Sequence, residues 1–313
     1  IDVFYGRGRV AGASIFSPQT GSVAVETPDG EVLTLVNERL IIATGSRPRH
    51  IPGLEPDGRL ILTSDEALEL ARLPSSLLIV GGGVIGVEWA SMMADFGVKV
   101  VLLEAAERLL PAEEEDVSRA MAAALAKRGV EIHTGASVLP ETLQKRESGG
   151  AGEVRIEAER RREAGQSGER FAVQAEAMLV AVGRTPNTDG IGLENVDVAL
   201  TGGAIKVNGF MQTSEPHIYA VGDVTGGLQM AHAASYQGIV AAEHICGAAD
   251  KPYDASLVPR CVFSHPEAAS IGLTEKQAKE AGMKAVSAKY PLSASGKALV
   301  HGEAAGFVKV VAD

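Results

Sequence analysis

The glycine-rich run Gly81-Gly82-Gly83-Val84-Ile85-Gly86 constrains the fold of this chain more than any other feature. Read from Gly81, it has the spacing G-x-G-x-x-G, and it lies between an apolar run at 77–80 and an apolar segment that stops at Gly97. This context predicts a strand, a tight turn and a helix. Two more strand-like runs, at 98–103 and 130–133, flank an amphipathic segment at 113–128. The alternation predicts an α/β fold with a doubly wound parallel sheet.

The same run predicts a dinucleotide site. In such a motif, one glycine allows the turn, the next lets a pyrophosphate approach the backbone, and the last lets the helix pack against the strand. Glu104 follows Gly81 by 23 residues, at the end of the next predicted strand. Its carboxylate would accept hydrogen bonds from ribose hydroxyls and repel a 2′-phosphate, which favours NAD over NADP. Arg108 nearby argues the other way, and a glycine-rich turn in an unrelated α/β protein is the alternative interpretation.

Other segments predict a larger α/β protein. We expect a β-hairpin at 23–35 around Asp29-Gly30, and a solvated loop and hairpin without a binding site at 145–170. Three apolar runs predict buried strands that end in glycine, at 40–45, 178–183 and 218–223. Further predicted elements are helices at 230–246 and 274–281 and strands at 260–263 and 307–311.

Composition excludes several classes of function. The net charge is −11, and no basic block occurs, so nucleic acid and anionic membranes are poor candidates as partners. The longest uncharged run, at 224–242, contains several polar side chains, so we expect it to be globular and not a membrane span. We expect no signal peptide and no metal site. Cys246 and Cys261 form no C-x-x-C or C-x₄-C pattern, so we expect two buried packing residues in a reducing, cytoplasmic compartment.

Two residues near the third glycine-ended strand have open interpretations. Asp223 could accept hydrogen bonds from a polyol chain, or could simply cap a turn. The helix predicted from residue 230 could stabilise negative charge on a bound ring at its N-terminus. His232 in its first turn could be a catalytic base, or could be structural.

Seven motifs together resemble the pyridine nucleotide–disulfide oxidoreductase family, most closely its members that oxidise dihydrolipoamide. Their order and spacing match the family over essentially the whole chain. The motifs are ATGSRPR at 43–49, TSDEAL at 63–68, IVGGGVIGVEWASMMADFGVKVVLLE at 79–104, VGRTPNTDGIGLENV at 182–196, IYAVGDVTGGLQMAH at 218–232, FSHPEAASIG at 263–272 and SGKALVHGEAAGFVKVVAD at 295–313.

The resemblance implies two cofactors, FAD and NAD. The residues that would contact NAD are Gly81, Gly82, Gly83, Val84, Ile85, Gly86, Glu104, Val138, Ala181, Val182, Gly183 and Arg184. The residues that would contact FAD are Gly8, Thr44, Gly45, Ser46, Asp223, Gln229, Met230, Ala231 and His232. Glu88 would support the junction between nicotinamide and flavin, although a carboxylate in the early turns of a helix also has a purely structural explanation.

The resemblance also implies a reaction and partners. Electrons would pass from the dihydrolipoamide of a lipoyl domain, in a 2-oxo acid dehydrogenase complex, to a disulfide, to FAD and then to NAD, in a homodimer. The family's N-terminal FAD motif and C-x₄-C pair, and its C-terminal His–Glu pair, have no counterpart here. We therefore expect a central part of a longer enzyme, with no catalytic residue of its own and without the complete activity.

The implied domains are the second part of an FAD domain at 1–74, an NAD domain at 75–186, a central FAD segment at 187–254 and the start of an interface domain at 255–313. Three alternatives remain: a mercuric reductase, a glutathione reductase, against which Glu104 argues, and a non-catalytic NAD-binding remnant.

Overall fold

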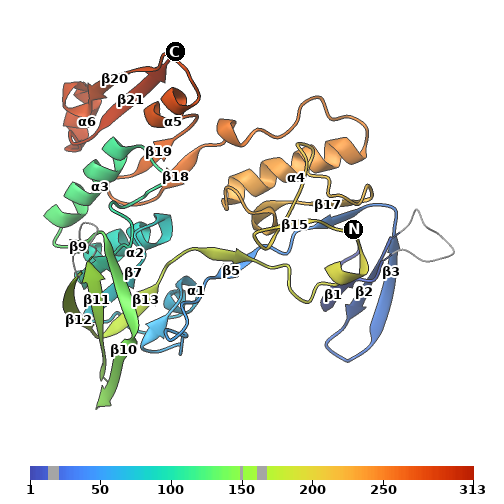
Figure 1. The fold of residues 1–313 in the computed structure, drawn as a ribbon, viewed down its shortest axis with the longest axis horizontal. Coiled ribbons are helices and arrows are strands. Elements are labelled where there is room, and N and C mark those ends of the chain that lie inside the picture. The colour runs from blue at the N-terminus through green and yellow to red at the C-terminus, as the bar shows by residue number, and fades with distance from the viewer. Residues whose placement is uncertain (13–20, 149–150, 161–167) are drawn as a thin grey trace. The chain divides into compact units, whose positions relative to one another are not determined.

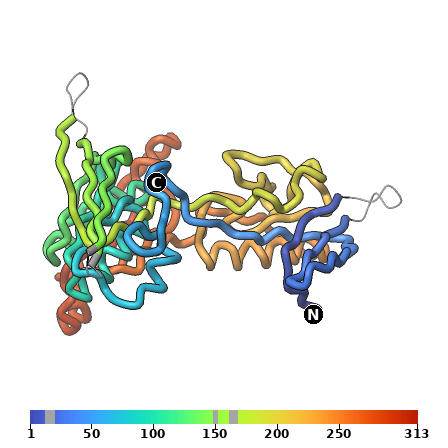
Figure 2. The backbone as a smooth tube through the Cα atoms, turned by 90° about the horizontal axis from the view of Figure 1, so that it is seen from below, coloured from blue at the N-terminus to red at the C-terminus, as the bar shows by residue number. Residues whose placement is uncertain are grey.

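The computed structural model describes residues 1–12, 21–148, 151–160 and 168–313. The chain divides into two compact units (Figure 1). The first contains residues 1–47 and 184–258, and the second contains 48–183 and 259–313. The backbone can be followed through each unit in Figure 2. This division is interleaved in sequence, and the predicted domain boundaries remain a prediction.

The second unit is built on a five-stranded parallel sheet with the order β6-β13-β7-β8-β9. Its strands are β6 (Ile61–Leu62), β7 (Ser76–Val80), β8 (Lys99–Leu103), β9 (Glu131–His133) and β13 (Ala177–Val180). The helices between them are α1 (Ser64–Leu68), α2 (Val84–Asp95) and α3 (Glu115–Lys127). The predicted alternation of strands and helices is confirmed, as is the parallel sheet.

Glycines end both major helices of this sheet. Gly97 and Gly129 have φ values of 78° and 88°, and each directly follows the residue that caps its helix. This left-handed conformation costs glycine little, because it has no Cβ. The chain can therefore turn at once into β8 and β9.

The two faces of the parallel sheet are covered differently. On one face, Ile79 and Leu102 pack with Val87 and Met93 of α2 in a buried cluster. On the other face lies a three-stranded antiparallel sheet of β10 (Ala136–Ser148), β11 (Ala151–Arg160) and β12 (Glu169–Ala175). Both faces are thus closed to water, as a parallel sheet requires.

The prediction of a solvated loop and hairpin at 145–170 is wrong in part. Antiparallel pairing of β10 with β11 is present, but Val154, Ile156 and Ala158 of β11 are fully buried. They alternate with charged residues, so one face of the strand is exposed to solvent and the other packs on the parallel sheet. Residues 149–150 and 161–167 of that prediction lie outside the described residues.

The C-terminal part of the second unit forms two small hairpin-like pairs. β18 (Arg260–Val262) pairs with β19 (Ala268–Ser270), and β20 (Val286–Pro291) pairs with β21 (Phe307–Ala312), both antiparallel. The remaining elements here are α5 (Glu275–Glu280), η4 (Leu292–Ala294) and α6 (Gly296–His301). Thr274 caps α5 with a reciprocal capping box, which explains where this predicted helix begins.

The first unit contains several small sheets and one long helix. One sheet is the antiparallel β1-β2-β3. Three separate two-stranded sheets are the parallel pair β4-β17, the pair β15-β16 and the pair β5-β14. Its strands are β1 (Arg7–Val10), β2 (Gly21–Glu26), β3 (Val32–Asn37), β4 (Leu40–Ile42), β5 (Ser46–Pro48), β14 (Arg184–Pro186), β15 (Leu200–Thr201), β16 (Ala204–Ile205) and β17 (Ile218–Ala220). Its helices are α4 (Ala231–Ile245), η1 (Leu193–Asn195), η2 (Gly222–Thr225) and η3 (Ala255–Leu257). The hairpin around Asp29-Gly30, the strand at 218–223 and the helix at 230–246 are confirmed.

Two burial predictions in this unit are corrected. The run at 40–45 forms a strand, but in β4 only Ile42 is buried and Ile41 is 40% exposed. Among the described strands, β4 has a single neighbour, β17, so one edge of it is uncovered. Cys246, expected in the interior, is exposed because it caps the C-terminus of α4, and Cys261 in β18 is half-buried.

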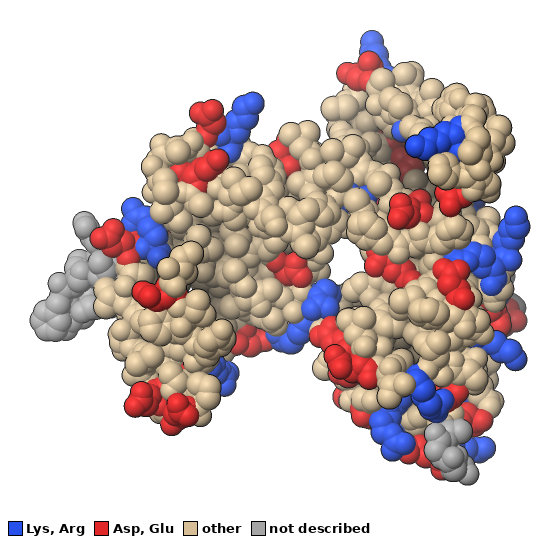
Figure 3. All heavy atoms as spheres, turned by 180° about the vertical axis from the view of Figure 1, so that it is seen from behind, with Lys and Arg blue, Asp and Glu red and all other residues tan. Residues whose placement is uncertain are grey.

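No helix among the described residues is long and apolar enough to cross a membrane. The uncharged run at 224–242 instead supplies the end of η2 and most of α4. On the face seen in Figure 3, acidic and basic side chains are interspersed.

Candidate functional site

The glycine turn between β7 and α2 is packed on two sides and open at one residue. A Cβ at Gly81, where φ is 112°, would lie 2.4 Å from the carbonyl oxygen of Ala181. A Cβ at Gly86 would lie 1.8 Å from the carbonyl oxygen of Gly81. A Cβ at Gly83 would meet nothing within 4 Å. Gly83 also caps α2 without a side-chain hydrogen bond, so the open space adjoins free helix N–H groups, which is where a pyrophosphate fits.

Glu104 lies beside this turn, directly after β8. One carboxylate oxygen accepts a hydrogen bond from the N–H of Gly82 at 2.5 Å, and the other accepts from the N–H of Ala106 at 2.7 Å. These bonds orient the half-buried side chain, while each oxygen keeps a further lone pair for a ribose hydroxyl. The structure thus brings the predicted turn and the predicted carboxylate together.

Three more residues of the predicted NAD set follow β13, the neighbour of β7. Ala181 contacts Gly81 as described, and Val182 and Gly183 continue from it. Val84 and Ile85 form the first turn of α2. Val138 lies on β10 and is half-buried against the parallel sheet.

Arg184 belongs to a different cluster from the rest of the NAD set. It lies in the first unit, where its Nε donates to the Ser46 hydroxyl at 2.7 Å and its Nη2 donates to the Ser46 carbonyl at 2.9 Å. The Ser46 hydroxyl in turn donates to the Asp223 carboxylate at 2.6 Å. Arg184, predicted to contact NAD, therefore organises two residues that were predicted to contact FAD.

The parallel pairing of β4 with β17 explains how Ser46 and Asp223 meet. Both strands end at the same edge of the sheet, so Thr44-Gly45-Ser46 and Gly222-Asp223 leave it side by side. Thr44 is fixed by its hydroxyl, which donates to the carbonyl of Asn187 at 2.7 Å. Ser46 therefore orients the Asp223 carboxylate through one of its two oxygens. Gly8 lies in β1, a strand of the separate sheet β1-β2-β3.

The first half of α4 lies close to Gly222 in the same unit, where a Cβ on Gly222 would be 3.3 Å from the Cβ of Ala234. The Gln237 side chain of α4 accepts a hydrogen bond from the N–H of Gly222 at 2.7 Å. Met230 caps α4 without a side-chain hydrogen bond, so no capping side chain neutralises the positive end of the helix dipole. Gln229 and Met230 are half-buried, and Ala231 and His232 are exposed.

Glu88 is held by a residue that the motifs do not suggest. Its carboxylate accepts a hydrogen bond from the backbone N–H of Phe263, directly after β18, at 2.8 Å. Burial raises the pKa of Glu88 above its ordinary value, and the bond from Phe263 offsets this only in part. The neutral form of Glu88 is therefore favoured more than in an exposed glutamate.

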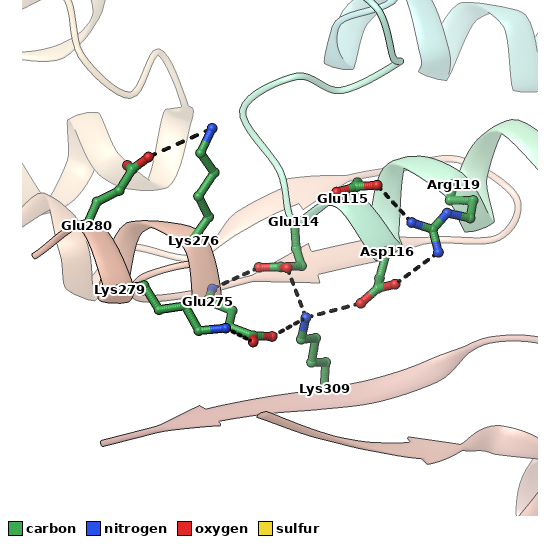
Figure 4. A pocket seen from close by; sticks show the side chains of 9 residues that line it. All are labelled: Glu114, Glu115, Asp116, Arg119, Glu275, Lys276, Lys279, Glu280 and Lys309. Atoms are coloured by element: carbon green, nitrogen blue, oxygen red, sulfur yellow. Dashed lines mark hydrogen bonds and ion pairs between the residues drawn. The ribbon is translucent and has the colours of Figure 1, made fainter. Parts of the chain in front are cut away.

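A pocket of about 430 Å³ lies in the second unit between α3, α5 and β21 (Figure 4). At its centre Lys309, 10% exposed, contacts Glu114 at 2.9 Å, Asp116 at 3.1 Å and Glu275 at 3.1 Å. These carboxylates raise the pKa of Lys309, although burial opposes the shift. The charged side chains that line the pocket pair with one another. They form an ion-pair network that links β21 to α3 and α5.

Comparisons with known proteins agree with this geometry. The family model described as pyridine nucleotide-disulphide oxidoreductase matches residues 8–238, and the dimerisation-domain model of the same family matches residues 258–313. The chain belongs to this family. The resemblance inferred from the motifs is thereby confirmed, as is the α/β dinucleotide-binding fold.

Several relatives and solved structures cover the whole chain or nearly so. A dihydrolipoyl dehydrogenase of Bacillus subtilis is 52% identical over all of this chain and 64% of its own length. One of Chlorobaculum tepidum is 43% identical over 97% of this chain and 62% of its own length. Among solved structures, LpdA of Mycobacterium tuberculosis has a TM-score of 0.84 at 28% identity, covering 98% of this chain and 63% of its own. An HOCl-induced flavoprotein disulfide reductase, RclA, of Escherichia coli has a TM-score of 0.81 at 30% identity, covering 100% of this chain and 66% of its own.

The chain thus spans a little under two thirds of the length of these curated relatives. Sequence reasoning missed the role of Arg184 with Ser46 and Asp223, and the bond from Phe263 to Glu88. The first could be suspected from the parallel order of β4 and β17, whose ends must meet. The second arises from backbone geometry, for which the sequence gives no signal.

Proposed function

We propose that this chain is part of a flavoprotein that oxidises protein-bound dihydrolipoamide and uses NAD as the electron acceptor. The observation that carries the proposal is the 52% identity, over the entire chain, to a dihydrolipoyl dehydrogenase. The glycine turn and Glu104 support it, because together they fit a dinucleotide that carries a free ribose 2′-hydroxyl.

For NAD, we propose that the pyrophosphate lies over Gly83, where a Cβ would meet nothing within 4 Å. The N–H groups at the start of α2 would bind its charge, and the Glu104 carboxylate would bind the ribose hydroxyls. Ala181, Val182, Gly183 and Val138 would line the other side. Arg184 fits the flavin better, since its hydrogen bonds go to Ser46.

For FAD, we propose that Asp223 accepts a hydrogen bond from the ribitol chain. Ser46 and Arg184 hold that carboxylate in place. The uncapped start of α4, from Met230, would stabilise negative charge that develops on the flavin ring. Gly45 has a φ of 69° and open space at its Cβ position, so the backbone here can approach a ligand closely.

In the proposed reaction the dithiol loses two electrons and two protons. NAD takes a hydride and one proton enters solvent. Bound FAD supplies the two-electron chemistry between a thiol and a nicotinamide. Glu88 would support the junction between nicotinamide and flavin, and the backbone N–H of Phe263 holds its half-buried carboxylate in place. Cys246 and Cys261 are both free and lie in different units, and neither is proposed as the redox thiol.

We further propose a homodimer, a lipoyl domain of a 2-oxo acid dehydrogenase complex as the partner, and a cytoplasmic location. The dimer is supported by the match of residues 258–313 to a dimerisation-domain model. The location is supported by two free cysteines, which suit a reducing compartment.

The test is a turnover assay on the intact purified protein with dihydrolipoamide as the donor. We expect a bound flavin, formation of NADH, and much weaker activity with NADP. Glutathione disulfide and mercuric ion serve as competing substrates with reduced nucleotide. Preferential reduction of either of these, or absence of a flavin, would refute the assignment.

A further inference from the structure

Arg108 lies four residues after Glu104 in the loop that leads from β8 to α3. Basic residues in this region bind the 2′-phosphate in enzymes that use NADP. In this structure the guanidinium points elsewhere. Its Nη1 donates to the carbonyl of Glu113 at 2.9 Å and to the hydroxyl of Ser118 at 2.7 Å, and its Nη2 donates to the carbonyl of Pro111 at 2.7 Å.

These bonds hold the loop at 109–113 in a strained and compact shape. A longer contact, at 3.4 Å, joins Nη1 to the carbonyl of Leu110. Leu110 itself has a φ of 48°, in the left-handed region that leucine seldom occupies. Such a conformation persists only where the surrounding contacts determine it. Arg108 supplies those contacts from one side, and Ser118, which is 3% exposed, supplies them from α3.

The loop at 109–113 contacts the glycine turn directly. The N–H of Leu110 donates to the carbonyl of Gly82 at 2.8 Å. The side chain of Leu109 lies so close to Gly82 that a Cβ there would be 2.5 Å from its Cδ2 atom. Gly82 is also the residue whose N–H binds Glu104. One residue of the turn is thus fixed by the loop through its carbonyl and by Glu104 through its N–H.

We propose that Arg108 is a positioning residue for the dinucleotide turn. It clamps residues 109–113 against Gly82, and the clamped loop sets the turn and Glu104 in the geometry that NAD requires. This inference rests on the proposed function, since it assumes that NAD binds at this turn. It also explains why a basic residue beside Glu104 does not make the site suitable for NADP, because the donors of Arg108 are directed at protein oxygens.

Two variants of the intact protein test the proposal, with a third as the matched control. Arg108→Lys removes the planar group that reaches several acceptors at once. Ser118→Ala keeps Arg108 and removes one of its partners. Arg128→Lys is the control, because Arg128 makes a comparable set of bonds, to Ser91, the carbonyl of His265 and Asp95, away from the glycine turn.

The readouts are the KM and kcat for NAD and the Kd for NADH, with flavin content as a check of folding. We expect Arg108→Lys to raise KM and Kd about tenfold with kcat nearly unchanged, since a small displacement of a binding group is costly. Ser118→Ala removes the bond from Arg108 and the bond that the hydroxyl donates to the Leu109 carbonyl, and should raise both constants at least about threefold. Arg128→Lys should leave both within about twofold.

Three outcomes would overturn the inference. In the first, neither test variant raises the KM more than Arg128→Lys does. In the second, the test variants lower kcat and leave the KM for NAD unchanged. In the third, Arg108→Lys weakens the binding of NADPH and leaves the binding of NADH unchanged, which would make Arg108 a ligand of the 2′-phosphate. Failure of the wild-type protein to bind NADH would instead refute the proposed function, so the two failures are distinguishable.

Discussion

Replacing Gly83 and replacing Gly86 of the glycine-rich motif should have different consequences: one should weaken dinucleotide binding and the other should destabilise the fold. Gly86→Ala places a methyl group 1.8 Å from the carbonyl oxygen of Gly81. Carbon and oxygen atoms in close contact normally lie about 3.3 Å apart, so the backbone must move by about 1.5 Å. Gly83→Ala places its methyl group where nothing lies within 4 Å. The first change disturbs the protein itself, whereas the second occupies the space proposed for a ligand.

The size of the stability loss follows from what surrounds each methyl group. Overpacking of a protein interior costs about 1–3 kcal/mol, and Gly86 meets backbone that no rotamer change can relieve, which puts it near 3 kcal/mol or above. In a unit of this size, each kcal/mol lowers the Tm by about 2–4 °C, so a fall of about 6–12 °C is expected. Gly83 caps α2, and exchanging glycine for alanine at a cap costs less than about 1 kcal/mol.

Thermal unfolding followed by circular dichroism, and NADH binding followed by fluorescence, separate the two effects. Gly83→Ala should unfold within about 4 °C of the wild type and still lose most of its NADH affinity. Gly86→Ala should unfold far earlier. The reasoning fails if Gly86→Ala unfolds within a degree or so of the wild type, or if Gly83→Ala binds NADH normally.

Three charged groups give further predictions. Hydrogen bonds from Lys279, Ser287 and Lys309 lower the pKa of Glu275 to about 2, so the charged form stabilises the fold above about pH 4.5, and this contribution is lost as the pH falls towards 2. Lys309→Met should therefore flatten the loss of stability over that window, measured by urea unfolding. Glu113 is 5% exposed and pairs with Arg260 at 3.0 Å, so Glu113→Ala, which leaves a cation unpaired, should cost about 3 kcal/mol in denaturant unfolding. Burial raises the pKa of Glu88, so the wild type should lose stability as the pH rises above about 4.5, whereas Glu88→Gln should not.

Matched comparisons decide each of these. Glu115 is 71% exposed and pairs with an exposed Arg119, so Glu115→Ala should cost less than about 0.5 kcal/mol and serves as the control for Glu113. Equal losses for the two variants would contradict the role given to the buried pair. A pH profile of Lys309→Met that parallels the wild type between pH 4.5 and 2 would count against the ion-pair network. A pH profile of Glu88→Gln that parallels the wild type above pH 4.5 would show that Glu88 is not held in a disfavoured charged state.

The sequence predicted the parallel sheet of the second unit because three signals agree there. The apolar runs at 77–80 and 98–103 are short and continuous, as strands covered on both faces are. Glycines stand where a left-handed φ is required, at Gly97 and Gly129. The turn at Gly81 and the carboxylate at Glu104 could be placed in space because adjacent parallel strands end at one edge.

Other features depend on contacts that local patterns do not reveal. The buried face of β11 was missed because Val154, Ile156 and Ala158 alternate with charged side chains, so the segment reads as polar. The exposure of Cys246 depends on the direction in which it leaves the end of α4. Arg108 could be identified as a basic residue near Glu104, but only the fold shows that its donors bind loop carbonyls and Ser118.

The most direct test of the central claim is anaerobic reduction of the intact protein by NADH and by NADPH. The proposed site requires that NADH bleach the visible absorption of a bound flavin. NADPH should act at least a hundredfold less effectively, because Glu104 opposes a 2′-phosphate with a like charge. A protein without a flavin, or one reduced equally well by both nucleotides, would contradict the account built on Gly81–Gly86 and Glu104.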